Sequence, residues 1–115
     1  MKHYRWTDIP AEQMNPATSR RYVTADRVTI ARFELKKGGV VPRHSHENEQ
    51  VTQVVSGALK FDVDGEEVIV RAGEVLHIPS GAEHGVEILE DTIAIDVFSP
   101  VRQDWIDKTD AYFKA

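Results

Sequence analysis

From Val23 onward, short runs of β-branched and aromatic residues alternate with turn residues. Runs of this kind at short, regular spacing are typical of an all-β sandwich or barrel. Asp64 and Gly65, between two alternating runs, predict a tight two-residue hairpin. The other breaks contain glycine, proline or acidic residues and fall at residues 36–39, 56–57, 72–73, 79–81 and 90–91. No segment has the apolar period of a long helix, so the pattern predicts an all-β fold.

The same pattern divides the chain into three parts. Residues 1–22, which contain Pro10 and Pro16, predict an irregular arm with room for one short strand. Residues 23–103 carry the strand pattern and predict the barrel, and residues 104–115 predict a tail or a short helix. At 115 residues, the chain has the length of one domain with one core.

Two of the predicted strands are apolar on both faces. Side chains two residues apart share a face of a strand. Over residues 50–56, Val51 and Val55 share one face and a third valine lies on the other. Over residues 92–98, three aliphatic side chains lie opposite Asp96, which is therefore expected to point into the barrel. A strand that is apolar on both faces is covered on both, by a second sheet or by a partner subunit.

Composition narrows the classes of function. The chain carries 19 acidic against 14 basic residues, a net charge of -5, and this balance argues against a nucleic-acid binder. No apolar run approaches the length of a membrane span, and the first residues lack the hydrophobic region of a signal peptide, so we expect a cytoplasmic protein. The sequence contains no cysteine, so any bound metal must have nitrogen and oxygen ligands.

His44 and His46 are candidate metal ligands. One residue separates them on an extended segment, so both imidazoles leave the same face and can bind one ion. Imidazole pairs suit zinc, iron, nickel, copper or manganese. Taken alone, the pattern also fits two surface histidines, and His84 alone also fits a core histidine bonded to the backbone. The strand parity of His77 turns it away from this face.

Two segments resemble the two motifs of the cupin family in residue types and spacing. The first runs from Gly38 through His44, His46 and Gln50 to Gly57, and the second runs from Gly73 through Pro79, Ser80 and Gly81 to His84. The resemblance implies a double-stranded β-helix, or jelly-roll barrel, with a short C-terminal helix. It also implies one divalent transition metal ion per chain (Ni, Mn, Zn, Fe, Cu or Co) on His44, His46, Gln50 and His84. Cupins often carry glutamate where this chain has Gln50, and the neutral amide favours a divalent, Lewis-acidic ion over redox cycling.

The segment from Asp96 to Trp105 is similar to the C-terminal segment of the KdgF family. These cupins of pectin and alginate degradation convert 4,5-unsaturated monouronates to linear keto-uronates. The resemblance implies that Asp96, Phe98 and Arg102 line an active site that takes an anionic sugar acid. Asp96 would move a proton, and Arg102 would bind the substrate carboxylate or pair with Asp96.

Other functions remain open at this stage. Three histidines and a glutamine also resemble the manganese-binding bacterial cupins with hydroxynitrile lyase activity. A metal-dependent dioxygenase would use an apolar pocket, to which Phe98, Val54 and Leu59 could contribute. A third reading is a non-catalytic module that binds metal or sugar, because the cupin fold also serves binding and sensing.

Apolar residues beyond the needs of one core predict a homodimer. A two-fold interface can cover such a surface, and the arm over residues 1–22 is available for strand exchange. The alternative is that these side chains pack between the barrel's own sheets. The residues concerned are Val51, Val55, Ile93, Ile95, Val97, Trp6 and Trp105.

Overall fold

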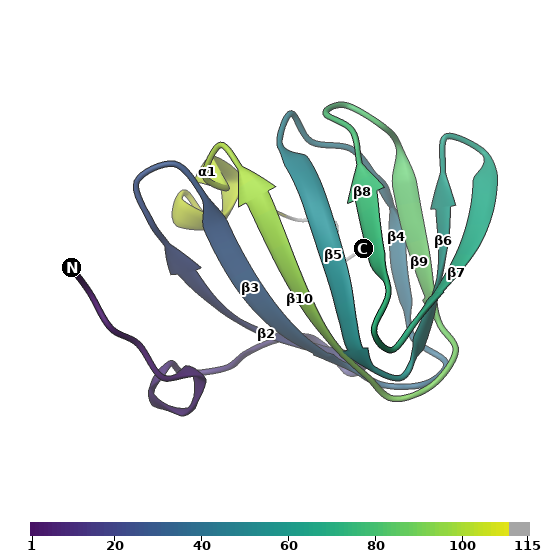
Figure 1. Cartoon of the computed structure of the whole chain (residues 1–115), viewed down its shortest axis with the longest axis horizontal. Helices are drawn as coiled ribbons and strands as arrows, with labels where there is room; N and C mark the ends of the chain where they lie inside the picture. The colour runs from purple at the N-terminus through teal and green to yellow at the C-terminus, as the bar shows by residue number, and fades with distance from the viewer. Residues whose placement is uncertain (111–115) are drawn as a thin grey trace.

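The chain folds into two antiparallel β-sheets that face each other (Figure 1). The computed structural model describes residues 1–110 of the chain. One sheet has six strands in the order β1-β2-β3-β10-β5-β8, and the other has four in the order β4-β9-β6-β7. The all-β jelly-roll prediction is therefore confirmed. The strands are β1 (Glu12–Asn15), β2 (Thr18–Thr24), β3 (Thr29–Leu35), β4 (Val40–His44), β5 (Glu49–Ser56), β6 (Ala58–Val63), β7 (Glu66–Arg71), β8 (Val75–Ile78), β9 (His84–Ile88) and β10 (Thr92–Ser99).

The predicted hairpin joins β6 to β7. Asp64 and Gly65 both have positive φ, at 49° and 89°, as a two-residue turn of type I′ requires. Val63 and Glu66 pair directly across the turn. The local sequence therefore sets the register of this half of the four-stranded sheet.

Strands β5 and β10 lie side by side in the larger sheet and bring the central side chains of the barrel together. Their register pairs Asp96 with Thr52 and Phe98 with Gln50. All four of these residues are buried, whereas Val51, which lies on the opposite face of β5, is exposed. The strand parity predicted from the sequence thus holds, and it directs one polar row of β5 and β10 into the barrel.

The segment expected to be an irregular arm contributes two strands to the larger sheet. β2 pairs with β3 along its whole length, from Thr18 opposite Leu35 to Thr24 opposite Thr29. The boundary expected at residue 22 lies inside β2. The stretch before β1 forms a 3-10 turn, η1, at Trp6–Asp8 (Figure 1), and Nε of Arg21 on β2 donates to the carbonyl of Ile9 at 2.9 Å.

The C-terminal segment carries a short helix, as predicted. This helix, α1, covers Gln103–Ile106, and the part of the predicted tail over residues 111–115 lies outside the described residues. Trp105 is fully buried against Tyr22, Phe33 and Phe98. Its expected role on an exposed dimer surface is therefore wrong, because α1 folds back onto the inner face of the larger sheet. Within residues 1–110, no helix is both long and apolar enough to cross a lipid bilayer.

Candidate metal centre

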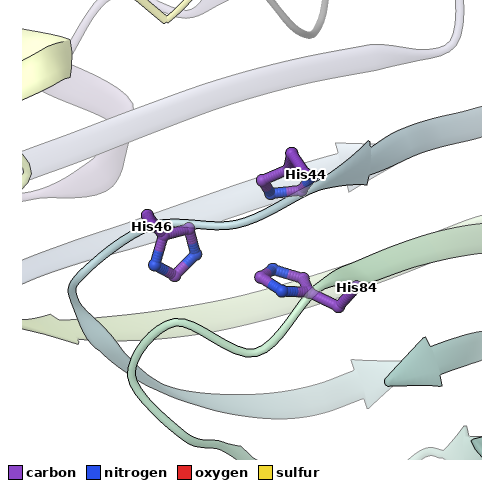
Figure 2. A group of neighbouring side chains, drawn as sticks. All are labelled: His44, His46 and His84. Carbon is purple, nitrogen blue, oxygen red and sulfur yellow. The ribbon is translucent and has the colours of Figure 1, made fainter. Parts of the chain in front are cut away.

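Three histidines from two neighbouring strands and a loop meet inside the barrel. His44 ends β4, His84 begins β9, and these two residues pair across the strands. His46 lies in the loop that follows β4, and Figure 2 shows its ring turned toward the space that the other two rings face. One ligand atom from each ring lies within 4.8 Å of the others. The cluster therefore has the spacing that a single metal ion requires.

The hydrogen bonds of the three rings fix which nitrogen can bind a metal. Each ring places its Nδ1 near a backbone carbonyl two residues away, and a carbonyl can only accept, so each Nδ1 carries the proton. The Nε2 atoms therefore carry the lone pairs, in the arrangement typical of metal-binding histidine. The pairs are His44 with Pro42 at 2.8 Å, His46 with Asn48 at 3.0 Å, and His84 with Ala82 at 2.9 Å.

Gln50, on β5, adds a fourth candidate metal ligand. Its side-chain Nε2 donates to Oγ1 of Thr52 at 2.9 Å, which turns Oε1 toward the histidines. That oxygen lies 3.1 Å from Nε2 of His46. Because the proton of His46 is on Nδ1, Nε2 of His46 and Oε1 of Gln50 are both acceptors. Two acceptors this close repel each other unless a cation lies between them. The four candidate ligands, three histidines and Gln50, therefore fit a divalent metal ion.

Burial keeps the three imidazoles neutral. It lowers the pKa of His44 and His46 to about 4, and the positive charges of neighbouring groups, Arg102 among them, act in the same direction. Burial also lowers the pKa of His84. At pH 7 the rings therefore hold no second proton that a metal ion would have to displace.

Asp96, on β10, lies beside the candidate metal ligands. It is 9% exposed, and its Oδ2 is 3.5 Å from Nε2 of Gln50. Its other oxygen, Oδ1, is buried and has no hydrogen-bond partner among residues 1–110. Burial raises the pKa of this carboxyl to about 6, against the opposing effects of the Thr52 hydroxyl and the Arg102 charge. The expectation that Asp96 points into the barrel agrees with this placement.

Arg102 is held by Asp104 and by two aromatic rings. Its Nε and Nη2 donate to the two carboxylate oxygens of Asp104 at 2.9 and 2.7 Å. Its Cζ lies 4.7 Å from the ring centroid of Phe98 and 4.5 Å from that of Trp105. The carboxylate that pairs closely with Arg102 is thus that of Asp104, two residues further along the same segment, and the charge of Arg102 also acts on Asp96.

These groups share one cavity of about 50 Å³. The part near the histidines is polar and is lined by His44, His84, Gln50, Thr52, Asp96 and Arg102. The remaining wall is apolar and includes Phe33, Leu59, Phe61, Val86, Phe98 and Trp105. The cavity thus combines a candidate metal site, a carboxyl group and a guanidinium group with an apolar floor.

Sequence reasoning missed one residue that joins the two halves of this site. The backbone carbonyl of Asn48 accepts the hydrogen bond from His46. Its side-chain amide donates to the carbonyls of Pro100 and Val101 at 2.6 and 3.1 Å, and the residue is 4% exposed. A buried asparagine between two ligand positions was the available signal. Its partners lie 52 and 53 residues away, so the sequence could not identify them.

Two comparisons place the chain among proteins of similar sequence and structure. It is 28% identical over 102 residues to the pectin degradation protein KdgF of Dickeya dadantii, covering 86% of this chain and 93% of that protein. It is 26% identical to the KdgF structure from a Halomonas species, with a TM-score of 0.85 over 91% of this chain and 98% of that one. An RmlC-like cupin from Shewanella frigidimarina has 26% identity and a TM-score of 0.83, over 91% and 96% of the two chains.

The match to a family is the strongest of these findings. The model of the cupin domain matches residues 31–98, which run from β3 to β10 and include all of the candidate metal ligands. This is more than half of the chain, and the match agrees with the two facing sheets and the three-histidine cluster. The chain therefore belongs to the cupin family.

Proposed function

We propose that this cupin binds one divalent transition metal ion through Nε2 of His44, His46 and His84 and Oε1 of Gln50. The supporting observation is the convergence of four acceptor atoms, two of which lie 3.1 Å apart. All four ligands are neutral, so the ion keeps its full charge. When bound, such an ion supplies Lewis-acid polarisation of a carbonyl or hydroxyl oxygen.

We further propose that the reaction is the conversion of a 4,5-unsaturated monouronate to a linear keto-uronate. The reaction is an isomerisation that needs no oxidant or reductant. The anomeric hydroxyl loses its proton, the bond between the anomeric carbon and the ring oxygen breaks, and a proton is added to the double-bond carbon C4. The observation that carries the proposal is Oδ1 of Asp96, a buried carboxyl oxygen that has no partner among residues 1–110 and belongs to a residue lining the same cavity as His44 and His84.

In this reaction Asp96 accepts the proton from oxygen and delivers it to carbon. Phe98 provides a flat apolar wall next to His46, with ring centroids 5.6 Å apart. Arg102 supplies a fixed positive charge at the cavity wall that attracts the substrate carboxylate. The similarity to pectin degradation proteins supports a sugar acid as the substrate.

The direct test of this function is an absorbance assay. A mixture of unsaturated monouronates absorbs in the ultraviolet, and the metal-loaded protein should accelerate the loss of this absorbance. The metal-free protein is the control, since it contains the same Asp96 without the ion. An unchanged rate with each of nickel, manganese, zinc, iron and cobalt would remove the uronate reaction as the function.

Replacing Arg102 by lysine tests its role in binding a carboxylate. Lysine keeps the charge but loses the planar fork, so we expect galacturonate to bind about tenfold more weakly, while neutral galactose binds as before. Isothermal titration measures both. Arg32→Lys is the matched control, because Arg32 pairs with Glu34 on the opposite face of the sheet. Equal weakening for both sugars, or for neither, contradicts the carboxylate role.

The apolar part of the cavity favours a second candidate. Leu59 and Phe98 line the cavity as predicted, whereas Val54 is buried in the core and does not line it. A lyase or dioxygenase acting on an apolar substrate would use this floor. Oxygen consumption in an electrode, with iron or copper bound, separates a dioxygenase from the isomerisation.

We also propose that two chains associate through the outer face of the six-stranded sheet. Register places Val23, Ile30, Val97 and Val51 in one row across four strands of this face. Val51 is 39% exposed and Val55 is 51% exposed. An apolar row across the outer face of a sheet can pack against the same row of a second chain under a two-fold axis.

Light scattering tests the dimer. Two chains of 13.0 kDa give a mass of about 26 kDa, and Ile95→Asp should reduce it to that of one chain while the metal content stays the same. Ile69→Asp, at an exposed position on the other sheet, is the control and should leave the mass unchanged. A mass of one chain for the unaltered protein across micromolar concentrations would refute the association.

A further inference from the structure

Trp105 is a buried hydrogen-bond donor without an acceptor. Its side chain is 0% exposed and lines the same cavity as His44 and His84. The indole Nε1 has no hydrogen-bond partner in the described part of the chain. Buried donors of this kind are rare in native proteins, and each one calls for a ligand or water that satisfies it.

The groups around the indole cannot accept its hydrogen bond well. The guanidinium groups of Arg20 and Arg102 lie 4.1 and 4.5 Å from the indole centroid, and a guanidinium only donates. The faces of the Tyr22 and Phe98 rings, both 5.1 Å away, are weak acceptors, and the indole N–H makes no hydrogen bond to the Tyr22 hydroxyl. The contacts around the indole therefore leave its N–H without an acceptor among residues 1–110, in a residue that lines the cavity.

The cavity also contains the complementary group. Oδ1 of Asp96 is a buried acceptor without a partner in the part of the chain that the structure describes, and Asp96 and Trp105 both line the same space. The two groups do not bond to each other. A ligand that satisfies both must carry a hydroxyl group for Asp96 and an oxygen acceptor for Trp105, and a sugar acid carries both.

The position of the indole is set from the barrel wall. Arg20 on β2 donates to Oδ2 of Asp110 at 2.7 Å, and both side chains are buried. At the other end of the segment, the backbone N–H of Arg102 donates to Oγ1 of Thr29 at 2.9 Å. These contacts hold the segment at both ends, so the indole N–H is preorganised before a ligand arrives.

We propose that the indole N–H of Trp105 binds the carboxylate of the ligand, next to the positive charge of Arg102. This inference rests on the proposed sugar-acid function and adds a second recognition group to it. A tryptophan N–H in this place selects ligands with an oxygen acceptor at the end that faces Arg102, because a ligand without one leaves the buried donor unsatisfied. Trp105 is thus a substrate-binding residue and not only part of the core.

Nuclear magnetic resonance can observe this N–H directly. The chain has two tryptophans, so the spectrum contains two indole N–H resonances, and the Trp105→Phe variant assigns them. Zinc-loaded protein is titrated with galacturonate, galactose and acetate. We expect galacturonate and acetate to move the Trp105 resonance downfield and to slow its exchange with solvent, and galactose to leave it in place.

Affinity provides a second readout. Trp105→Phe keeps an aromatic ring between the two guanidinium groups and removes only the N–H and the larger ring area. We expect the dissociation constant for galacturonate to rise about tenfold, as for the loss of one hydrogen bond to a charged group, with unchanged zinc content. Trp6→Phe makes the same chemical change at a residue of the arm and should leave the dissociation constant unchanged.

The outcomes separate this inference from the proposed function. If acetate moves the resonance but galacturonate does not bind, the sugar-acid substrate is wrong and the donor role of Trp105 stands. If galacturonate binds the wild type with no change in the Trp105 resonance, the inference is overturned whatever the enzyme activity. An unchanged dissociation constant in a folded Trp105→Phe variant overturns it as well, since the N–H would then serve only water.

Discussion

Replacing both His44 and His46 by alanine should abolish metal binding and leave the barrel folded. The double change removes two of the four proposed ligands, and the remaining pair cannot hold a divalent ion at micromolar concentration. The fold should survive, because a domain of this size has a core of its own and does not depend on an ion as a zinc finger does. Elemental analysis after dialysis measures the metal, and circular dichroism measures the fold.

The matched control for this experiment is His77→Ala. His77 is exposed on the outer face of β8, where it pairs with Glu49 at 2.7 Å. Its removal should leave one metal ion per chain. Stoichiometric metal in the double variant would show that the ligand assignment is wrong, and loss of metal in the His77 variant would point to a second, external site.

Replacing Asp96 by asparagine should abolish turnover while the metal stays bound. The amide has nearly the size and shape of the carboxyl group but cannot accept and deliver a proton. Loss of general acid-base catalysis of this kind lowers a rate by roughly 10²–10⁴-fold. The initial rate of absorbance loss with an unsaturated monouronate measures the effect, and elemental analysis of the same sample measures the metal.

Asp26→Asn provides the control for the loss of one negative charge. Asp26 is exposed in the turn between β2 and β3, so its variant should keep the full rate. Asp96→Ala should behave as the asparagine variant does, with a larger cavity. Turnover above about a tenth of the wild-type rate in the asparagine variant would exclude Asp96 from proton transfer.

The features that the sequence predicted well are those that depend on neighbouring residues. The hairpin at Asp64 and Gly65 follows from the backbone preferences of two residues. The inward direction of Asp96 follows from alternation along one strand. The convergence of His44 and His46 follows from their spacing on an extended segment, and only the family resemblance added His84 and Gln50.

The features that the sequence did not predict depend on partners far along the chain. The strands in the first 22 residues exist because β2 pairs with β3, and the local prolines gave no sign of this. Trp105 is among the apolar residues that exceed the expected needs of one core, and the sequence therefore predicts a place for it at a dimer interface. Its burial depends on Phe33 and Tyr22, which lie on strands more than half the chain away.

The double role of Asn48 makes the two halves of the site thermodynamically dependent on each other. Its carbonyl orients His46, and its amide holds the segment that carries Arg102 and Trp105. We therefore expect binding at the proposed metal site and at the proposed carboxylate site to be coupled, and by reciprocity each would change the affinity at the other by the same factor. In evolution, an insertion between His46 and Gln50 would thus alter ligand recognition as well as metal affinity, so these two distant stretches of sequence are expected to vary together.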